Sequence, residues 1–314
     1  MKQKQAAALV LALLLAGCGL AAGEGEGQAP GELPGEGLSA PAPEDPPPSP
    51  EEPEKPTEPA GPREEALHPY LRQLVEETAA GLVSPGMSQY DRAKAAFDYM
   101  IRSTSFEEPI GLELWRIHGG GEEPIPYLEQ RALSPLRFGI GTCEDYAAAL
   151  TLLLREMGLR AQYVPGLTFS VEGNLVDHAW TVVEIDGTWY HLDSQLEDNI
   201  SRRGRVRYKY FLRGDNSLLA THRWGQNLVD SGLLPPEQQE KLQRDWLTPV
   251  CPRDLPPPQE TVFPETFPNL SLLKGEAAEE LAAWEAKNGP LPPMTLNTVP
   301  PVFGLGGYGP ADEG

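Results

Sequence analysis

The stretch GTCEDYAAALTLLLREMGL, residues Gly141–Leu159, decides the fold because it predicts a buried helix that begins at a cysteine. Thr142 is the expected N-cap, with Asp145 as the reciprocal partner of a capping box. The apolar run behind Cys143 predicts burial, and Gly158 is expected to close the helix. Cys143 would lie in the first turn, where unpaired backbone N–H groups and the macrodipole favour an anion. Since the thiolate is the nucleophilic form of cysteine, this position indicates a nucleophile.

A second stretch, HAWTVVEIDGTWYHLD, begins at His178 and predicts a β-hairpin. A two-residue turn at Asp186 and Gly187 would place Trp180 opposite Asp193 on the returning strand. His178 has the same parity as Trp180, so it would share a face with Asp193 as a diagonal neighbour, roughly 7–8 Å away between backbones. A shift of one residue in the pairing would put the two side chains on opposite faces.

Each of these residues also has an ordinary structural interpretation. A single cysteine in an apolar helix is usually a packing residue, and a lone strand histidine is usually a satisfied core residue. His191 shares the face of Asp193 and is a weaker alternative base, whereas His222 is expected to cap or to pack. What favours chemistry is the combination, because Cys143, His178 and Asp193 supply the nucleophile, base and orienting group of acyl transfer through a thioester.

The same residues resemble the transglutaminase-like superfamily over roughly 88–225. The resemblance is carried by Gly-x-Cys-x-x-Tyr-Ala at the helix start, His-Ala-Trp on one strand and Gly-x-Trp-Tyr-x-x-Asp on the next. It implies an α+β, papain-like/transglutaminase-like fold with N-terminal helices packed on an antiparallel sheet, and Cys143, His178 and Asp193 as the catalytic triad. Members of the family include cross-linking acyltransferases, peptidases and amidases. The implied activity is therefore acyl transfer or hydrolysis at amide bonds of proteins or peptides, and the choice between cross-linking and hydrolysis stays open.

The resemblance also implies an upstream side chain that supports the oxyanion hole. Gln130, Tyr127 and Trp115 are the candidates, and the backbone N–H of Cys143 is the surer contributor. Trp180 is expected in the core or in the wall of the substrate pocket. The expected partner is a protein or peptide amide substrate, with cell-wall peptide as one such substrate. We expect no metal and no cofactor, because no Cys, His or carboxylate cluster has metal-ligand spacing and there is no dedicated Ca²⁺ loop.

Two other functions remain open. Arylamine acetyltransferases order Cys, His and Asp with similar spacing, although they use a cytosolic thioester donor. A surface binding module could keep the same fold and triad without turnover.

The start of the chain predicts export. Residues 1–17 combine Lys2 and Lys4 with an apolar run too short for a membrane span of about 20 residues, as in a secretory signal peptide. The run ends in Leu-Ala-Gly-Cys, which resembles a bacterial lipobox and predicts lipidation of Cys18. The alternative is an ordinary signal peptide that contains a cysteine. The expected location is the extracytoplasmic face of the cell membrane, with the lipid as the only membrane attachment.

Composition divides the rest of the 314 residues. The 34 prolines and 32 glycines concentrate toward both ends, and the formal charge is −21, which excludes nucleic acid as a partner because phosphate contacts need basic residues. Residues 18–63 are Pro-, Glu- and Gly-rich and predict a disordered tether. Residues 64–250 are expected to form the transglutaminase-like domain, with mostly loop over 103–138 and a strand at VRYKYFL. Residues 251–314 are expected to be a Pro-rich tail with a short helix.

Overall fold

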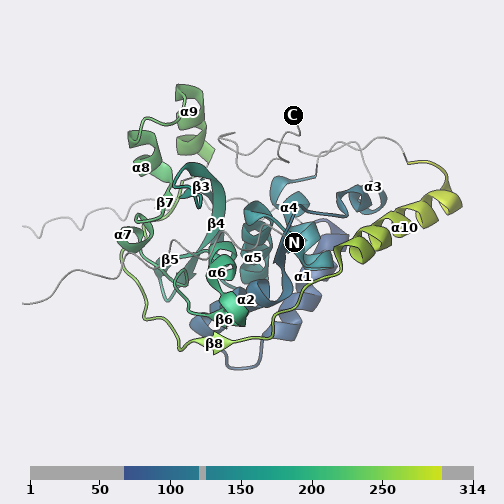
Figure 1. Ribbon diagram of the computed structural model, residues 1–314, viewed down its shortest axis with the longest axis horizontal. Coiled ribbons are helices and arrows are strands. Elements are labelled where there is room, and N and C mark those ends of the chain that lie inside the picture. The colour runs from purple at the N-terminus through teal and green to yellow at the C-terminus, as the bar shows by residue number, and fades with distance from the viewer. Residues whose placement is uncertain (1–66, 120–124, 246, 292–314) are drawn as a thin grey trace, which may run out of the picture. The chain divides into compact units, whose positions relative to one another are not determined.

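A computed structural model describes residues 67–119, 125–245 and 247–291 (Figure 1). The expected signal peptide, the expected lipidation site Cys18 and the expected tether lie outside the described residues. All described residues belong to one compact unit. No helix in the described part of the chain is long and apolar enough to cross a membrane.

Four helices form the helical layer of the unit: α1 (Pro69–Leu82), α2 (Gln89–Ser103), α4 (Tyr127–Phe138) and α5 (Cys143–Glu156). The N-terminus of α2 carries a capping box formed by Ser88 and Asp91. Most of α5 is buried, including Leu150, Leu153 and Leu154. This burial explains why α5 is the central helix, as its apolar sequence predicts.

The main sheet has four antiparallel strands in the order β5-β4-β3-β7. Their bounds are Ala161–Phe169 for β3, Leu175–Ile185 for β4, Thr188–Leu192 for β5 and His222–Arg223 for β7. Asp186 and Gly187 both have positive φ, at 49° and 77°, as a tight hairpin turn with mirror-image geometry requires. Ile185 pairs with Thr188, so the predicted hairpin register is confirmed.

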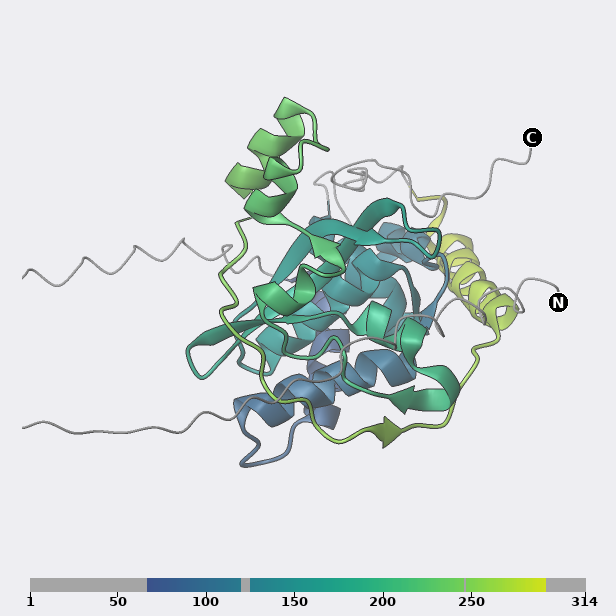
Figure 2. The same cartoon turned by 60° about the vertical axis from the view of Figure 1, so that its left-hand side comes forward.

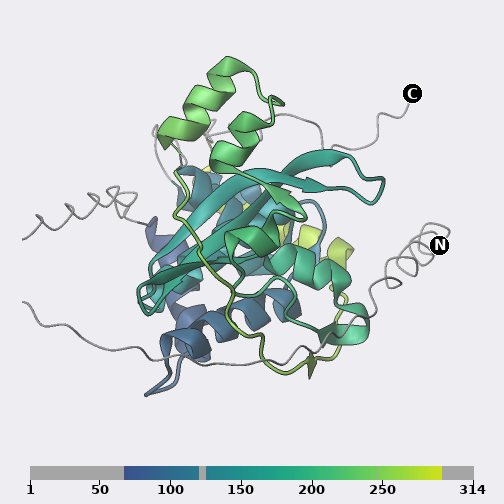
Figure 3. The same cartoon turned by 90° about the vertical axis from the view of Figure 1, so that its left-hand side faces the viewer.

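Apolar side chains cover both faces of this sheet. Val183 and Ile185 of β4 pack into the large core that also contains α1, α2, α4 and α5. Trp180 and Val182, at alternate positions of β4, pack instead with Trp224. This alternation is the period of two that defines a strand with two buried faces. Figure 3 shows β3 and β4 crossing over the helical layer. The expected α+β class, with N-terminal helices packed on an antiparallel sheet, is confirmed.

Two local predictions were wrong. Residues 103–138, expected to be mostly loop, contain β1 (Ser105–Phe106), η2 (Leu112–Leu114), α3 (Trp115–His118) and α4. The helix α4 forms despite Pro135 in its interior, because its apolar face, including Ala132 and Leu133, is buried. At VRYKYFL only β6 (Arg205–Val206) is a strand, since Tyr208 and Leu212 adopt left-handed φ values of 58° and 50° that break an extended chain.

Several shorter elements follow β5: α6 (Ser194–Ile200), η3 (Arg202–Gly204), α7 (Asp215–Leu218), α8 (Gly225–Asp230), α9 (Pro236–Asp245), β8 (Thr261–Val262) and α10 (Leu270–Asn288). The sequence before α5 also includes β2 (Ile140–Gly141), which pairs in parallel with β1. Figure 2 shows α8 and α9 as a pair at one end of the sheet, where Leu228 and Leu242 pack with Leu167 of β3.

The folded region does not end at residue 250. The strand β8 pairs with β6, and Ala277 of α10 is buried with Leu114 and Phe138. Arg116 of α3 also forms an ion pair with Glu285 of α10, 3.4 Å apart. The proline content of this segment predicted a tail with a short helix. Its few apolar side chains instead pack against side chains that come together only in the folded domain.

Candidate active site

The helix α5 places Cys143 at its first position. Thr142 donates its backbone N–H to Oδ2 of Asp145, 2.7 Å away, and the reciprocal capping box is formed as predicted. Arg131 of α4 holds this helix start from outside, with its Nε 2.9 Å from Oδ1 of Asp145 and its Nη2 3.0 Å from Oε2 of Glu144. Cys143 is 7% exposed, so most of the residue is buried and a small part of its surface reaches solvent.

A threonine fixes α5 against the strand that carries His178. Thr181 Oγ1 donates to the carbonyl of Ala147 at 3.1 Å, and Thr151 Oγ1 lies 3.1 Å from the same hydroxyl. Ala147 is one turn beyond Cys143, and Thr181 is three residues beyond His178. This contact therefore sets the distance and angle between the nucleophile and the histidine.

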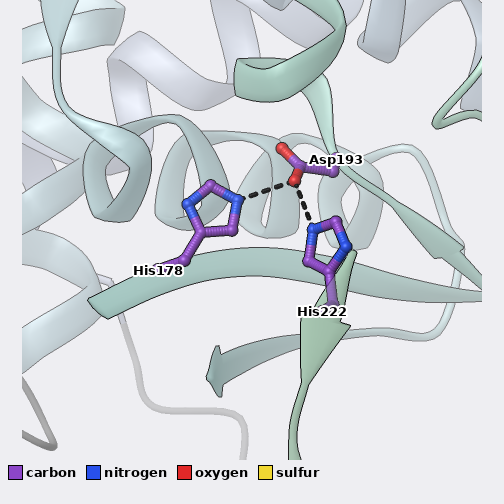
Figure 4. Close-up of side chains that lie close together, drawn as sticks. All are labelled: His178, Asp193 and His222. Atoms are coloured by element: carbon purple, nitrogen blue, oxygen red, sulfur yellow. Dashed lines mark hydrogen bonds and ion pairs between the residues drawn. The ribbon is translucent and has the colours of Figure 1, made fainter. Parts of the chain in front are cut away.

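His178 and Asp193 meet as the hairpin register predicts. Nε2 of His178 lies 2.7 Å from Oδ2 of Asp193 (Figure 4), and both residues are buried. Burial alone would lower the pKa of His178, but the charge of Asp193, the hydrogen bond to Asp193 and a side-chain hydrogen bond with Cys143 raise this pKa to about 10. Because Nε2 is engaged by Asp193, Nδ1 is the ring nitrogen available to the thiol.

The carboxylate of Asp193 stays ionised. Burial would raise its pKa, but the charge of His178 and hydrogen bonds from His178 and His222 hold the pKa well below its usual range. Its other oxygen, Oδ1, accepts the backbone N–H of Leu196 at 2.9 Å, because Asp193 is the N-cap of α6. The same residue therefore caps a helix and orients a histidine.

A buried glutamate supports this helix cap. Glu197 accepts the backbone N–H groups of Arg207, Tyr208 and Tyr210 at 2.8–3.0 Å. The carbonyl of Tyr210 in turn accepts the N–H of Asp193 at 3.0 Å. The loop that replaces the predicted strand is thus tied to α6 and holds the backbone of Asp193.

His222 is the residue of this site that the sequence interpretation missed. Its Nε2 lies 2.9 Å from Oδ2 of Asp193, the oxygen that also binds His178 (Figure 4). The sequence around His222 has no spacing relationship to the hairpin. Only the pairing of β7 with β3, Thr168 opposite His222, brings it to the site.

The glycines before Cys143 serve packing. A Cβ on Gly139 would lie 2.3 Å from the carbonyl oxygen of Ser103. A Cβ on Gly141 would lie 2.6 Å from the Cβ of Asp145. Close packing inside the protein therefore explains why both positions are glycine.

The candidate oxyanion and pocket residues have other hydrogen-bond partners. Gln130 donates its Nε2 to the carbonyl of Ile125 at 2.6 Å, and the hydroxyl of Tyr127 donates to Glu144 at 2.6 Å. Trp115 is fully buried against the ring of His68. The structure therefore brings Tyr127 close to the start of α5 through Glu144, but it gives none of the three a contact with Cys143. A role for them in the oxyanion hole stays a prediction.

Trp180 lies in the core more than in an open pocket. It is 1% exposed, its ring stacks with His178 at 5.9 Å between centroids, and its Nε1 donates to Nδ1 of His191 at 2.9 Å. Nε2 of His191 lies 2.9 Å from Asp215. Burial lowers the pKa of His191 more than Asp215 raises it, so this ring is a neutral support for Trp180.

Tyr163 of β3 is a further residue near the nucleophile that the sequence interpretation did not select. Burial raises its pKa well above the usual value, and the charges of Tyr127, Glu144 and Cys143 add to that rise. Its ring is T-shaped to that of Tyr127, 6.0 Å away. Tyr163 pairs with Thr181, so the strand register could have indicated its proximity.

Two sets of side chains have the composition of metal ligands: His178, Asp193 and His222, and separately His191, Asp215 and Cys251. In the second set Trp180 donates to Nδ1 of His191, so the neutral ring carries its proton on Nε2, facing Asp215. A nitrogen that carries a proton has no lone pair for a metal. In the first set both Nε2 atoms point at one oxygen of Asp193 at hydrogen-bond distance. We interpret both sets as hydrogen-bonded networks.

The fold and the site define an α+β protein of the papain-like class, in which a helix presents a cysteine to an antiparallel sheet that carries a histidine and an aspartate. Residues 76–194 match the family model of the transglutaminase-like superfamily, and this part of the chain is a transglutaminase-like domain. The matched range contains Cys143, His178 and Asp193 but not His222.

Comparisons of the whole chain add distant likenesses. No curated protein matches the sequence at a significant level. A protein from Cytophaga hutchinsonii described as a candidate cysteine protease shares 17% identity over 41% of this chain and 39% of its own, with a TM-score of 0.30. A TGase shares 23% identity over 40% and 30%, with a TM-score of 0.26. An arylamine N-acetyltransferase from Bacillus cereus shares 16% identity over 41% and 49%, with a TM-score of 0.29. The chain thus spans less than half the length of each of these structures.

Proposed function

We propose that this protein is a lipid-anchored, extracytoplasmic cysteine enzyme that performs acyl transfer or hydrolysis at amide bonds of proteins or peptides. The observation that carries the proposal is the position of His178, whose ring hydrogen-bonds Asp193 through Nε2 on a strand that is fixed to the helix beginning at Cys143. This arrangement suits a cysteine nucleophile, its base and the orienting carboxylate.

The pKa of His178, raised to about 10, makes its ring an imidazolium at neutral pH, so the proton of the Cys143 thiol rests on His178 before the attack begins. Asp193 favours this state because its carboxylate faces the imidazolium. The sulfur then attacks the amide carbonyl, and the tetrahedral oxyanion forms next to the first turn of α5. Backbone N–H groups there have no helical acceptor and can donate to the oxyanion.

Collapse of this intermediate breaks the C–N bond. The imidazolium of His178 gives its proton to the leaving amine or ammonia, and the acyl group stays on Cys143 as a thioester. Attack on the thioester by water, deprotonated by His178, releases the acid, and attack by a primary amine forms a new amide. Both outcomes use the same residues, so the triad supports hydrolysis and cross-linking equally.

The predicted lipobox supports the location. A lipid on Cys18 would hold the domain outside the cytoplasm, where exported proteins and cell-wall peptides are the accessible amides. The Pro- and Glu-rich segment 18–63 would separate the domain from the membrane surface.

A thiol-reactive probe on the purified chain, followed by a screen of peptide amides, tests the proposal. Cys143 should react rapidly at neutral pH, and the modified protein should lose amide turnover. Cys251 is the internal control, because it is fully buried and its pKa is raised by burial. Mapping the label by mass spectrometry separates the two cysteines. Fast labelling without turnover of any amide would favour a binding module over an enzyme.

A further inference from the structure

We propose that His222 is a positioning residue of this site, which holds the Asp193 carboxylate so that His178 keeps Nδ1 directed at Cys143. The inference rests on the proposed cysteine chemistry and adds to it a residue that lies outside the matched family range of 76–194.

Three donors surround the carboxylate of Asp193. Leu196 N–H binds Oδ1 at 2.9 Å, while His178 and His222 approach Oδ2 at 2.7 and 2.9 Å. With only the first donor, the carboxylate would be fixed at one oxygen and free to swing about it. His222 supplies a second protein contact that does not take part in proton transfer. The position of Oδ2 is then defined by a contact that does not depend on the protonation of His178.

The tautomer of His222 suits this role. Burial lowers its pKa, an effect that outweighs the opposing hydrogen bond and charge of Asp193, so the ring is neutral. Nδ1 lies 2.8 Å from the hydroxyl of Thr221, which can donate to it. The single ring proton then lies on Nε2 and is donated to Asp193. The Asp193 carboxylate, which can only accept, thus selects the form of His222 that donates from Nε2, and the Thr221 hydroxyl stabilises that form by donating to Nδ1.

The central strand β3, which contains Gly166, brings the two histidines to one carboxylate. β3 lies between β4 and β7, with His178 opposite Gly166 and His222 opposite Thr168. A Cβ on Gly166 would lie 2.4 Å from the indole of Trp180. Because Gly166 has no Cβ, the indole of Trp180 packs against both imidazoles, T-shaped to His222 at 4.8 Å and stacked with His178 at 5.9 Å between ring centroids. These ring contacts help to fix the orientation of both histidines.

Other titratable groups face the same carboxylate. The hydroxyl of Tyr210 has a pKa raised to about 12 by burial and by the charges of Asp193 and Glu197. Glu197 has its own three backbone donors. Asp193 itself has the N–H of Leu196 and the rings of His178 and His222 as its donors.

The test is the pH dependence of Cys143 alkylation by iodoacetamide in the full chain, which needs no substrate. Replacing the ring by His222→Leu should slow alkylation at neutral pH about tenfold to a hundredfold, the range for loss of one hydrogen bond to a charged group. The pH of half-maximal alkylation should rise, since a displaced Asp193 stabilises the imidazolium of His178 less. His222→Gln keeps an N–H donor near the position of Nε2 and should restore most of the rate.

Thr221→Val is the milder matched variant, since it removes the hydroxyl that donates to Nδ1 of His222 and keeps the side-chain shape. It should shift the profile in the same direction by a smaller amount, and it remains informative if His222→Leu does not fold. A parent-like pH profile in folded His222→Leu or in Thr221→Val, with only a lower Tm, would show that His222 merely packs and would overturn the inference. Absence of amide turnover with an altered profile would instead refute the proposed function and leave the role of His222 supported.

Discussion

Nε2 of His178, on β4, lies 2.7 Å from Oδ2 of Asp193, the residue that directly follows β5. The last pair between these antiparallel strands is Thr181 with Leu192, so the same register carried one residue further puts Trp180 opposite Asp193, and His178 is the next residue on that face. A diagonal pair of this kind depends on the two-residue turn at Asp186 and Gly187. The geometry of the candidate triad is thus fixed by a turn at the far end of the hairpin.

The triad variants should lose activity as a unit. Cys143→Ala should abolish turnover, and Cys143→Ser should nearly do so, because a hydroxyl is far less acidic than a thiol. His178→Ala should cost a similar factor, since losses at interdependent residues do not add. Asp193→Asn should reduce kcat by up to about 10⁴-fold while leaving measurable activity, because the aspartate orients the ring and does not bond to substrate. The measurement is single-turnover formation of the acyl-enzyme in all four variants. A wild-type rate in His178→Ala would refute the assignment of the base.

The His178–Asp193 pair should contribute to stability in a defined pH window. The pKa of His178 is raised from 6.5 to about 10, so its contribution is fully present below about pH 6.5 and is lost as the pH rises through 10. The pKa of Asp193 is lowered, so its contribution is present above its ordinary value of 3.8 and is lost at lower pH. The difference in Tm between the parent and His178→Gln should therefore be largest near pH 5–6 and shrink toward pH 10. A difference that grows above pH 8 would contradict the pairing.

Glu197 should be a major stabiliser of the loop that follows α6. Glu197→Ala leaves three buried backbone N–H groups unpaired and should lower the free energy of unfolding by about 3–5 kcal/mol. Glu197→Gln keeps one acceptor oxygen and should cost about 1–2 kcal/mol. Urea denaturation measures both, and amide exchange at Tyr210 should accelerate more than exchange within α5. Equal costs for the two variants would show that the acceptor oxygens are not what matters.

The C-terminal segment should be required for solubility of the domain. A chain that ends at residue 250 lacks β8 and α10 and exposes Ile110, Leu114 and Phe138, so it should aggregate or lose several degrees of Tm. A chain that ends after Leu291, whose carbonyl accepts from Arg116, is the matched control and should behave as the parent. Parent-like thermal denaturation of the shorter chain would restore the boundary at residue 250.

The anchor prediction concerns residues outside the described structure. Cys18→Ala should abolish incorporation of a fatty-acid analogue and leave the protein unprocessed or released into the medium, because the lipid is the only strong membrane attachment that the sequence predicts. Cys251→Ala controls for the loss of a cysteine elsewhere and should label as the parent does. Equal labelling of the Cys18→Ala protein would end the lipoprotein interpretation.

Local sequence determined much of this protein. The capping residues and apolar run fixed α5 with Cys143 at its start, and the turn residues fixed the hairpin register that joins His178 to Asp193, because both depend on neighbours within one element or one turn. The same local rules failed at α4, where burial of Ala132 and Leu133 outweighs Pro135, and at 206–212, where Glu197 draws the backbone into a loop.

Only the tertiary structure decided the rest. His222 reaches Asp193 because a two-residue strand, β7, pairs with β3, with Thr168 opposite His222, and α10 packs where α3 and α4 leave apolar side chains uncovered. These contacts join segments far apart in sequence. No periodicity or spacing records them, because the energy that selects them comes from burial and hydrogen bonding between elements that meet only once the chain has folded.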